Sequence, residues 1–381
     1  MKQHEQMNQW SRGVRSGRRW RLLTAFVVLV VIALVGAACG NDDDDGAPQG
    51  DRKLVIVPAG GSVTTNMNAA FLVPFSIETG TEIEIVEAGQ QVGALEAQVS
   101  SGNVLWDLVD CLTADVVARP ELYEELDTSV VQSTSDYVIE DSGEAASRSI
   151  FTEFAVLPNI AYRTDTYPDG GPTSWADFFD TTTFPGARGM FDLGLFSAWR
   201  IATVALISDG VDPNPESLIP LDLDRAYEVL DRIRPDVRAF FSGFTQGQDL
   251  LRSGEVDMMM LADGRTFQLM QQGAPVANVY PTDKTFLSGA RLCVPKGAPN
   301  KEVAFEFMEY VLSNPQQQAV FASLSTYGPP TNAGAQAALD LGIDDFNTLH
   351  PELFMVDSDF LEYVQENADE LLSRWNAWVA S

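Results

Sequence analysis

The chain has 381 residues, in which 54 acidic side chains outnumber 24 basic ones and give a formal net charge of −30. Such a surface repels nucleic acid phosphates, whose binding requires Lys and Arg, so we expect no nucleic-acid partner. Two histidines in the whole chain exclude a histidine-rich metal site. The length exceeds that of one typical hydrophobic core and predicts two domains.

The first 38 residues have the pattern of an export signal. A basic head ending at Arg21 precedes an uncharged stretch from Leu22 to Ala38. A positively charged N-terminal region, an apolar segment and small residues before the cleavage site are typical of a secretory signal peptide. An uncleaved membrane helix is the alternative, because the stretch is close to the shortest length that spans a bilayer.

The residues around Cys39 suggest how the exported chain is held. Gly36-Ala37-Ala38-Cys39 resembles the lipobox of bacterial lipoproteins, in which the cysteine is acylated and becomes the new N-terminus, although Gly36 stands where leucine is preferred. Residues 39–51 are rich in Asp, Gly and Pro and predict an extended linker. We therefore expect an exported cell-membrane lipoprotein that faces the outside.

Strands and helices alternate from residue 53 onward. Lys53 to Val57 is a β-branched strand, followed by a Gly-rich turn and a helix that ends near Gly80. "TEIEIVEAG" has the alternation of a second strand, and a helix then precedes a third strand that ends at Cys111. This order predicts a parallel sheet with right-handed crossovers.

A second α/β unit follows. The helix "AWRIATVALISDG" is stopped by Gly210, and "DLDRAYEVLDRIRP" places Ala226, Leu230 and Ile233 on one helical face. "VDMMML" reads as a buried strand, and "ARLCVPKGAPNKEVAFEFMEYVLS" reads as strand, turn and helix. A last helix lies near the C-terminus.

Catalytic and nucleotide-binding motifs are absent from the sequence. It contains no G-x-S-x-G elbow, P-loop, G-x-G-x-x-G or C-x-x-C motif, and His350 precedes a proline in a polar stretch typical of a turn. We expect no metal, no cofactor and no enzymatic activity. An extracellular enzyme that uses carboxylates alone is the alternative.

Several segments occur in an order and spacing that carry a family resemblance. They are "FSIETGTEIEIVEAG", "LWDLV", "IAYRTD", "SWADFFDTTTFPGARGM", "LLRSGEVDMMM", "VPKGAPNKEVAFEFMEYVLS" and "YGPPTNAGA". Together they resemble bacterial extracellular solute-binding proteins of the spermidine/putrescine-binding type. The resemblance implies a two-lobed α/β fold of the periplasmic-binding-protein kind, with mostly parallel sheets, hinge strands and a ligand cleft between the lobes.

The resemblance also implies boundaries and partners. We expect a signal peptide at 1–38, a lipidated linker at 39–51, the first lobe at 52–158 and 266–325, the second lobe at 159–265, and a helical C-terminal segment at 326–381. The chain would be a monomer that captures a small polar solute and delivers it to the permease subunits of an ABC importer. A sensor-type binding protein is an alternative that differs only in its partner.

The segments expected at the cleft depart from the polyamine-binding pattern. Such binders sandwich the ligand between aromatic rings and pair its ammonium groups with carboxylates. Here the first loop, "AGGSVTT", has no aromatic residue, Ala262 stands for a tryptophan, and Ser197 and Arg200 stand where acids are expected. A ligand that bears a carboxylate, with an amine facing Asp263, suits these residues better than the polyamine that is the family default.

The candidate ligand-binding residues are polar side chains at the expected cleft: Ser62, Thr64, Asp110, Thr113, Ser197, Arg200, Asp263, Arg291 and Tyr327. Five of them have a structural alternative. Ser62 and Thr64 could cap a helix, Asp263 could cap the helix that follows it, and Arg200 and Arg291 could form surface ion pairs.

Cys111 and Cys293 both lie in apolar runs with strand character. Export permits a disulfide between them. Two buried free thiols that behave as small hydrophobic side chains are the alternative.

Overall fold

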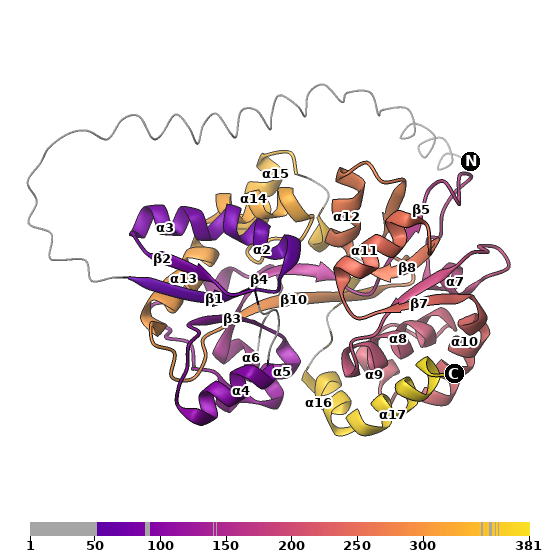
Figure 1. Cartoon of the computed structure of the whole chain (residues 1–381), viewed down its shortest axis with the longest axis horizontal. Coiled ribbons are helices and arrows are strands. Elements are labelled where there is room, and N and C mark those ends of the chain that lie inside the picture. The colour runs from indigo at the N-terminus through magenta and orange to yellow at the C-terminus, as the bar shows by residue number, and fades with distance from the viewer. Residues whose placement is uncertain are drawn as a thin grey trace, which may run out of the picture. The chain divides into compact units, whose positions relative to one another are not determined.

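Two mixed α/β sheets organise the chain (Figure 1). The computed structural model describes residues 52–87, 92–139, 141, 143–343, 346–349, 353–354, 356 and 358–381. The expected signal peptide, Cys39 and the acidic linker lie outside these residues, as does His350. The two-sheet α/β architecture confirms the predicted fold class.

The first sheet has the strand order β11-β10-β3-β1-β2, and β4 also pairs with β10. Its strands are β1 (Lys53–Val57), β2 (Glu82–Ile85), β3 (Leu108–Cys111), β4 (Ser149–Val156), β10 (Thr285–Cys293) and β11 (Leu353–Phe354). β1 is parallel to β2 and β3, as the alternating sequence pattern predicts, whereas β10 is antiparallel to both β3 and β4.

The second sheet has the order β7-β6-β8-β5-β9. Its strands are β5 (Asn159–Arg163), β6 (Arg188–Phe191), β7 (Val237–Phe241), β8 (Met258–Leu261) and β9 (Val276–Val279). β6 is parallel to β7 and β8, and β5 is antiparallel to β8 and β9. Because β9 belongs to this sheet, the chain returns to the first sheet after Val279, later than the boundary at 265 that the sequence suggests.

The helices divide between the two sheets. Those that follow or cover strands of the first sheet are α2 (Gly61–Met67), the π-helix η3 (Asn68–Leu72), α3 (Val73–Thr79), α4 (Val92–Ser101), α5 (Thr113–Ala118), α6 (Gly143–Arg148), α13 (Lys301–Ser313), α14 (Pro315–Ser325) and α15 (Asn332–Asp340). The 3₁₀ segments there are η4 (Pro120–Leu122), η5 (Ser133–Asp136) and η7 (Asn347–Leu349).

The second sheet has its own helices: α7 (Trp175–Phe179), α8 (Leu195–Ser208), α9 (Pro215–Leu218), α10 (Leu223–Ile233), α11 (Phe244–Ser253), α12 (Asp263–Gln271), α16 (Ser358–Glu366) and α17 (Ala368–Val379). The start of α10 follows from its sequence, because the Asp222 side chain accepts a bond from Arg225 N and caps the first turn. The predicted apolar face of Ala226, Leu230 and Ile233 is fully buried.

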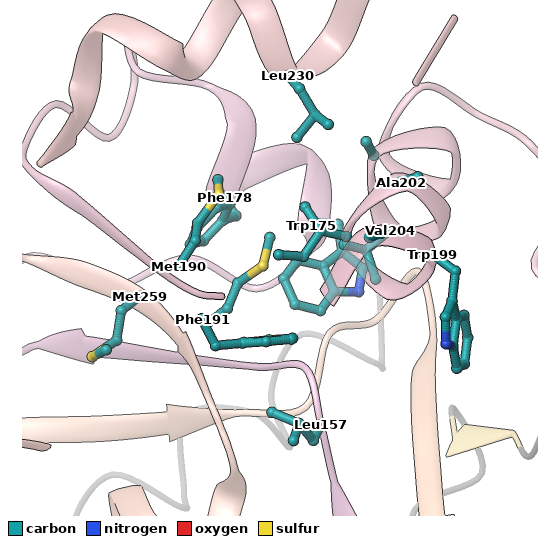
Figure 2. Packing of buried hydrophobic residues seen from close by; sticks show 14 of the residues in the cluster. Leu157, Trp175, Phe178, Met190, Phe191, Trp199, Ala202, Val204, Leu230 and Met259 are labelled. Carbon is teal, nitrogen blue, oxygen red and sulfur yellow. The ribbon is translucent and has the colours of Figure 1, made fainter. Parts of the chain in front are cut away.

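The largest buried cluster lies against the second sheet, and Figure 2 shows part of it. It includes Trp175 and Phe178, whose rings meet edge to face at 5.8 Å. Trp375 and Trp378 of α17 belong to the same cluster, so the C-terminal helix completes this core. Removal of such a buried aromatic side chain costs about 3–5 kcal/mol.

Cys111 and Cys293 lie on the paired strands β3 and β10, which bring them to diagonal positions. Their Cα atoms are 6.1 Å apart and their sulfur atoms form a disulfide. Both side chains are buried. The bridge closes a loop of 182 residues that contains the entire second sheet.

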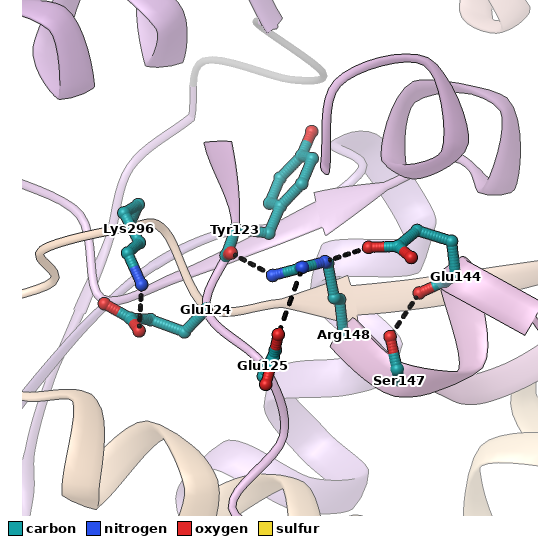
Figure 3. A network of polar contacts seen from close by, with 7 residues as sticks. All are labelled: Tyr123, Glu124, Glu125, Glu144, Ser147, Arg148 and Lys296. Carbon is teal, nitrogen blue, oxygen red and sulfur yellow. Dashed lines mark hydrogen bonds and ion pairs between the residues drawn. The ribbon is translucent and has the colours of Figure 1, made fainter. Parts of the chain in front are cut away.

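A polar network ties α6 to the loop after η4 (Figure 3). Arg148, the last residue of α6, donates to the Tyr123 carbonyl at 3.0 Å and to Glu125 at 3.3 Å, and it also pairs with Glu144. Lys296 pairs with Glu124 at 3.0 Å beside it. Such partly exposed ion pairs contribute about 0.2–1 kcal/mol each. No helix in the described ranges is long and apolar enough to cross a bilayer.

Candidate ligand-binding site

One edge of the second sheet gathers the starts of three helices. The parallel strands β6, β7 and β8 end there, and α8, α11 and α12 begin after them. Open α/β sheets bind ligands beyond the carboxyl ends of their strands. Arg200 lies in the second turn of α8 and Arg265 in the first turn of α12, so both cations lie near this edge.

The Arg200 guanidinium rests on aromatic rings. Its Cζ atom lies 3.6 Å from the centre of the Phe196 ring and 4.1 Å from that of Trp199. Nε is shielded from solvent and has no hydrogen-bond partner, and within the described residues Arg200 forms no ion pair. Burial lowers the pKa of this guanidinium from its usual value, yet it stays charged at neutral pH. A shielded cation of this kind is stabilised by an anion that approaches it.

Asp263 connects the two sheets. Its Oδ1 atom accepts a hydrogen bond from Val156 N at 3.0 Å, while Oδ2 accepts from Asn347 Nδ2 at 2.9 Å and from Tyr280 OH at 3.2 Å. The side chain is fully buried, and burial raises its pKa to about 6. Three donors of the protein itself therefore bind this carboxylate, where the sequence suggests that a ligand amine would bind it.

Arg265, which the sequence analysis passes over, makes a direct contact between elements of the two sheets. Its Nη1 atom donates to Ser62 Oγ at 2.8 Å, next to the Gly60–Gly61 turn after β1. A Cβ atom on Gly61 would lie 2.9 Å from the same Nη1 atom, and the φ of 61° at this position also favours glycine. The sequence feature that could have identified Arg265 is a basic residue in the first turn of a helix, where the helix macrodipole disfavours cations.

Arg291 and Thr113, both predicted to contact ligand, bond to each other. Arg291 Nε donates to Thr113 Oγ1 at 2.9 Å, and the guanidinium pairs with Asp141 at 2.5 Å and bonds to Ser149 Oγ at 3.0 Å. It also stacks over Phe151 at 3.7 Å. Arg291 is 2% exposed, so its pair with Asp141 is a buried structural ion pair of the first sheet.

The other predicted residues divide between buried packing and local bonding. Ser197 Oγ accepts from Leu193 N at 2.7 Å and shapes the turn before α8. Tyr327 is buried, and its ring fills the space where Gly264 lacks a side chain. Thr64 is buried with no partner for its hydroxyl, and Asp110 is buried near the end of β3.

Glu153 is a second residue that the sequence analysis misses. It lies in the middle of β4, is 2% exposed, and forms no ion pair with a described Lys or Arg. Burial, with a smaller contribution from the nearby Asp110, raises its pKa to about 8. A lone acid within the apolar run "SIFTEFAV" is the signal that could have identified it.

Comparisons with known proteins relate this chain to a family. A family model described as bacterial extracellular solute-binding protein matches residues 70–346. A gamma-aminobutyric acid-binding protein of Pseudomonas aeruginosa is 27% identical over 337 residues, covering 86% of this chain and 91% of that protein. Spermidine/putrescine-binding periplasmic protein 1 of Haemophilus influenzae is 27% identical, covering 73% of this chain and 76% of that protein.

Solved structures agree with the sequence matches. An ABC transporter substrate-binding protein from Bradyrhizobium japonicum superimposes with a TM-score of 0.73 and 28% identity, covering 86% of this chain and 99% of that one. The structure of the GABA receptor Atu4243 gives a TM-score of 0.71 and 30% identity, covering 86% of this chain and 97% of that one.

Proposed function

Because the chain belongs to the bacterial extracellular solute-binding protein family of ABC transporters, and not to an enzyme family, we propose that its solute is a small zwitterion whose carboxylate binds Arg200. The predicted class of function is confirmed by the family match. The solute itself is our proposal, and a linear amino acid such as gamma-aminobutyrate is the compound that the relatives suggest.

The observation that carries this proposal is the lack of an anion beside Arg200 among the described residues. A guanidinium that is partly withdrawn from water and stacked on Phe196 and Trp199 has hydrogen-bond donors in a fixed fork. That fork matches a carboxylate through two parallel bonds. A polyamine would bring a second cation to the same place and would be repelled.

Isothermal titration calorimetry with gamma-aminobutyrate, putrescine, spermidine and butyrate tests the proposal. We expect gamma-aminobutyrate to bind most tightly. Arg200→Ala should weaken that binding by about one to two decades, because a charge-assisted hydrogen bond contributes roughly 1.5–3 kcal/mol. The matched control is Arg238→Ala, which removes an exposed arginine on β7 and should leave affinity unchanged. Tight putrescine or spermidine binding that survives Arg200→Ala would overturn the proposal.

We also propose that the mature chain is tethered to the outer face of the cell membrane through acylated Cys39, so that the captured solute stays close to the permease. Gly36-Ala37-Ala38-Cys39 after a basic head supports this anchor.

A further inference from the structure

Gly264 lies at a close approach between elements of the two sheets. It belongs to α12, which follows a strand of the second sheet and contacts α14 (Figure 1). A Cβ atom on Gly264 would lie 2.6 Å from Cζ of Tyr327 and 2.7 Å from the carbonyl oxygen of Ser325, at the end of α14. Atoms in ordinary contact are about 3.5–4.0 Å apart, so an added methyl group would have to separate the two elements by about 1 Å.

The backbone of α12 does not itself require glycine at this position. Gly264 lies in the first turn of the helix, and it is not among the glycines with positive φ. Alanine forms helices more readily than glycine does. The approach of Tyr327 and Ser325 therefore explains why residue 264 has no side chain, and the helix alone does not.

The start of α12 is fixed to the second sheet. Gln248 of α11 donates to the carbonyl oxygen of Arg265 at 3.0 Å and to Gln268 Oε1 at 2.8 Å. Leu269, on the next turn of α12, is fully buried in the large core beside the second sheet. The first turn of α12 therefore moves together with the second sheet.

The turn that Gly264 meets is fixed to the first sheet. Gly328 and Phe154 of β4 exchange two backbone hydrogen bonds, each of 3.0 Å. Thr326 has a left-handed φ of 64°, which a β-branched residue keeps only where its surroundings hold it. Protein interiors are close-packed, so a displacement at Gly264 passes to the two sheets as whole bodies.

The neighbours of Gly264 in α12 also contact the first sheet. Asp263 accepts a hydrogen bond from Val156 N at the end of β4, where the chain crosses to β5 of the second sheet. Arg265 donates to Ser62 Oγ at 2.8 Å, beside the turn after β1. Separation of the sheets at Gly264 would therefore lengthen the Arg265–Ser62 contact.

We propose that Gly264 is a positioning residue for solute binding, because its missing side chain lets the two sheets approach closely enough to contact one solute together. The inference rests on the proposed function, since it requires a solute that is held between the sheets. Domains that close around a ligand do so by rotation about a few residues, so a small obstruction beside the crossing keeps the whole cleft open. Gly264 thus controls affinity without touching the solute.

Small-angle X-ray scattering and titration calorimetry of the mature protein test this role. With saturating gamma-aminobutyrate, Gly264→Ala should have a larger radius of gyration than wild type, and its affinity should be about ten- to a hundredfold weaker. Gly93→Ala is the matched control. It adds the same methyl group at an exposed position of α4 that has no atom within 4 Å, so it should behave as wild type.

A second variant tests whether the methyl group acts through Tyr327. Tyr327→Ala removes the ring that the added Cβ would meet. Gly264→Ala should therefore weaken binding less in a Tyr327→Ala background than in wild type, because residues in contact have non-additive effects. Circular dichroism checks the fold of each variant. If Gly264→Ala alone does not fold, the double variant compared with Tyr327→Ala carries the same two measurements, and equal radius and affinity would overturn the inference.

The outcomes separate this inference from the proposed function. A radius of gyration and an affinity that are unchanged in Gly264→Ala would overturn the inference and leave Arg200 as the carboxylate partner. Weaker binding with an unchanged radius would also overturn it, because the effect would then be local. If wild type binds putrescine in place of gamma-aminobutyrate, and Gly264→Ala weakens that binding and expands the protein, the inference stands and the proposed function is overturned. Absence of binding by every compound in the panel would overturn both.

Discussion

The Asp263 carboxylate and the backbone N–H of Val156 are 3.0 Å apart, and their hydrogen bond joins the first turn of α12 to the end of β4. β4 belongs to the first sheet and α12 follows a strand of the second. Asn347 of η7 donates to the same carboxylate and also to the Phe154 carbonyl. Three segments that are distant in sequence therefore meet at one buried acid.

Replacement of Asp263 should destabilise the protein. Asp263→Ala leaves the Val156 N–H and the Asn347 amide without their acceptor, and each buried unsatisfied group costs about 1–3 kcal/mol. Denaturant unfolding should show this loss, whereas Asp169→Ala, at an exposed position, should change stability by less than about 0.5 kcal/mol. Equal stability of the two variants would contradict the connecting role of Asp263.

The Arg265–Ser62 contact should be coupled to solute binding. It joins α12 to the turn after β1, and a ligand held between these elements would favour the same approach. Titration calorimetry of Arg265→Ala, Ser62→Ala and the double variant should give non-additive losses of affinity, with a coupling energy of about 0.5–3 kcal/mol. Arg252→Ala, which removes an exposed ion pair within α11, is the control. Strictly additive effects would show that the contact plays no part in binding.

The disulfide should contribute to the stability of the exported protein. Bridges of native domains typically contribute about 2–5 kcal/mol, and this one closes a long loop. Cys111→Ser/Cys293→Ser should therefore unfold at a lower denaturant concentration. Thiol titration of the unfolded, unreduced protein with Cys39→Ala should detect no free thiol, and two free thiols would rule the bridge out.

The contribution of Glu153 to the stability of the ligand-free protein should fall as pH rises. The pKa of Glu153 is about 8 in the fold against an ordinary value of 4.5, so the folded state holds a proton that the unfolded state loses between these values. The contribution is most favourable below pH 4.5 and is lost as pH rises through 8. Unfolding at pH 5 and pH 8 should show a smaller drop for Glu153→Gln than for wild type, by a few kcal/mol as an order of magnitude. Identical drops would contradict a buried, neutral Glu153.

The lipid anchor should be visible in the mass of the mature protein. Cleavage before Cys39 and acylation of its thiol predict an N-terminus at Cys39 with added acyl mass. Cys39→Ala should block processing or release the protein from the membrane. An intact mass that retains residues 1–38 would exclude the anchor.

The sequence predicted the architecture better than the site. Alternation in "TEIEIVEAG" and the β-branched run before Pro58 found the parallel strands, because periodicity reflects which face is buried. The strand β9 was missed, since its four residues carry no clear alternation and its place depends on pairing with β5. The crossing back to the first sheet was consequently placed too early in the chain.

Side-chain partners depend on distant segments, which explains the differences at the site. Arg291 is a surface or ligand-binding candidate in the sequence, but the fold places Asp141 beside it across 150 residues. Asp263 is fixed by Val156 and Asn347 in the same way. The prediction for Arg200 did not depend on a distant partner. It came from a cation at a position where polyamine binders have acids, and the fold leaves Arg200 without an ion pair among the described residues.

The tryptophans, which dominate the ultraviolet fluorescence, are distributed unevenly between the two sheets. Of those in the described ranges, Trp175, Trp199, Trp375 and Trp378 all lie in the core beside the second sheet, and only Trp106 lies near the first. Ultraviolet emission therefore reports chiefly on one half of the molecule. Trp199 touches the Arg200 guanidinium, a charge that shifts indole emission, so neutralisation of that charge by an anion becomes an intrinsic fluorescent signal that needs no attached dye.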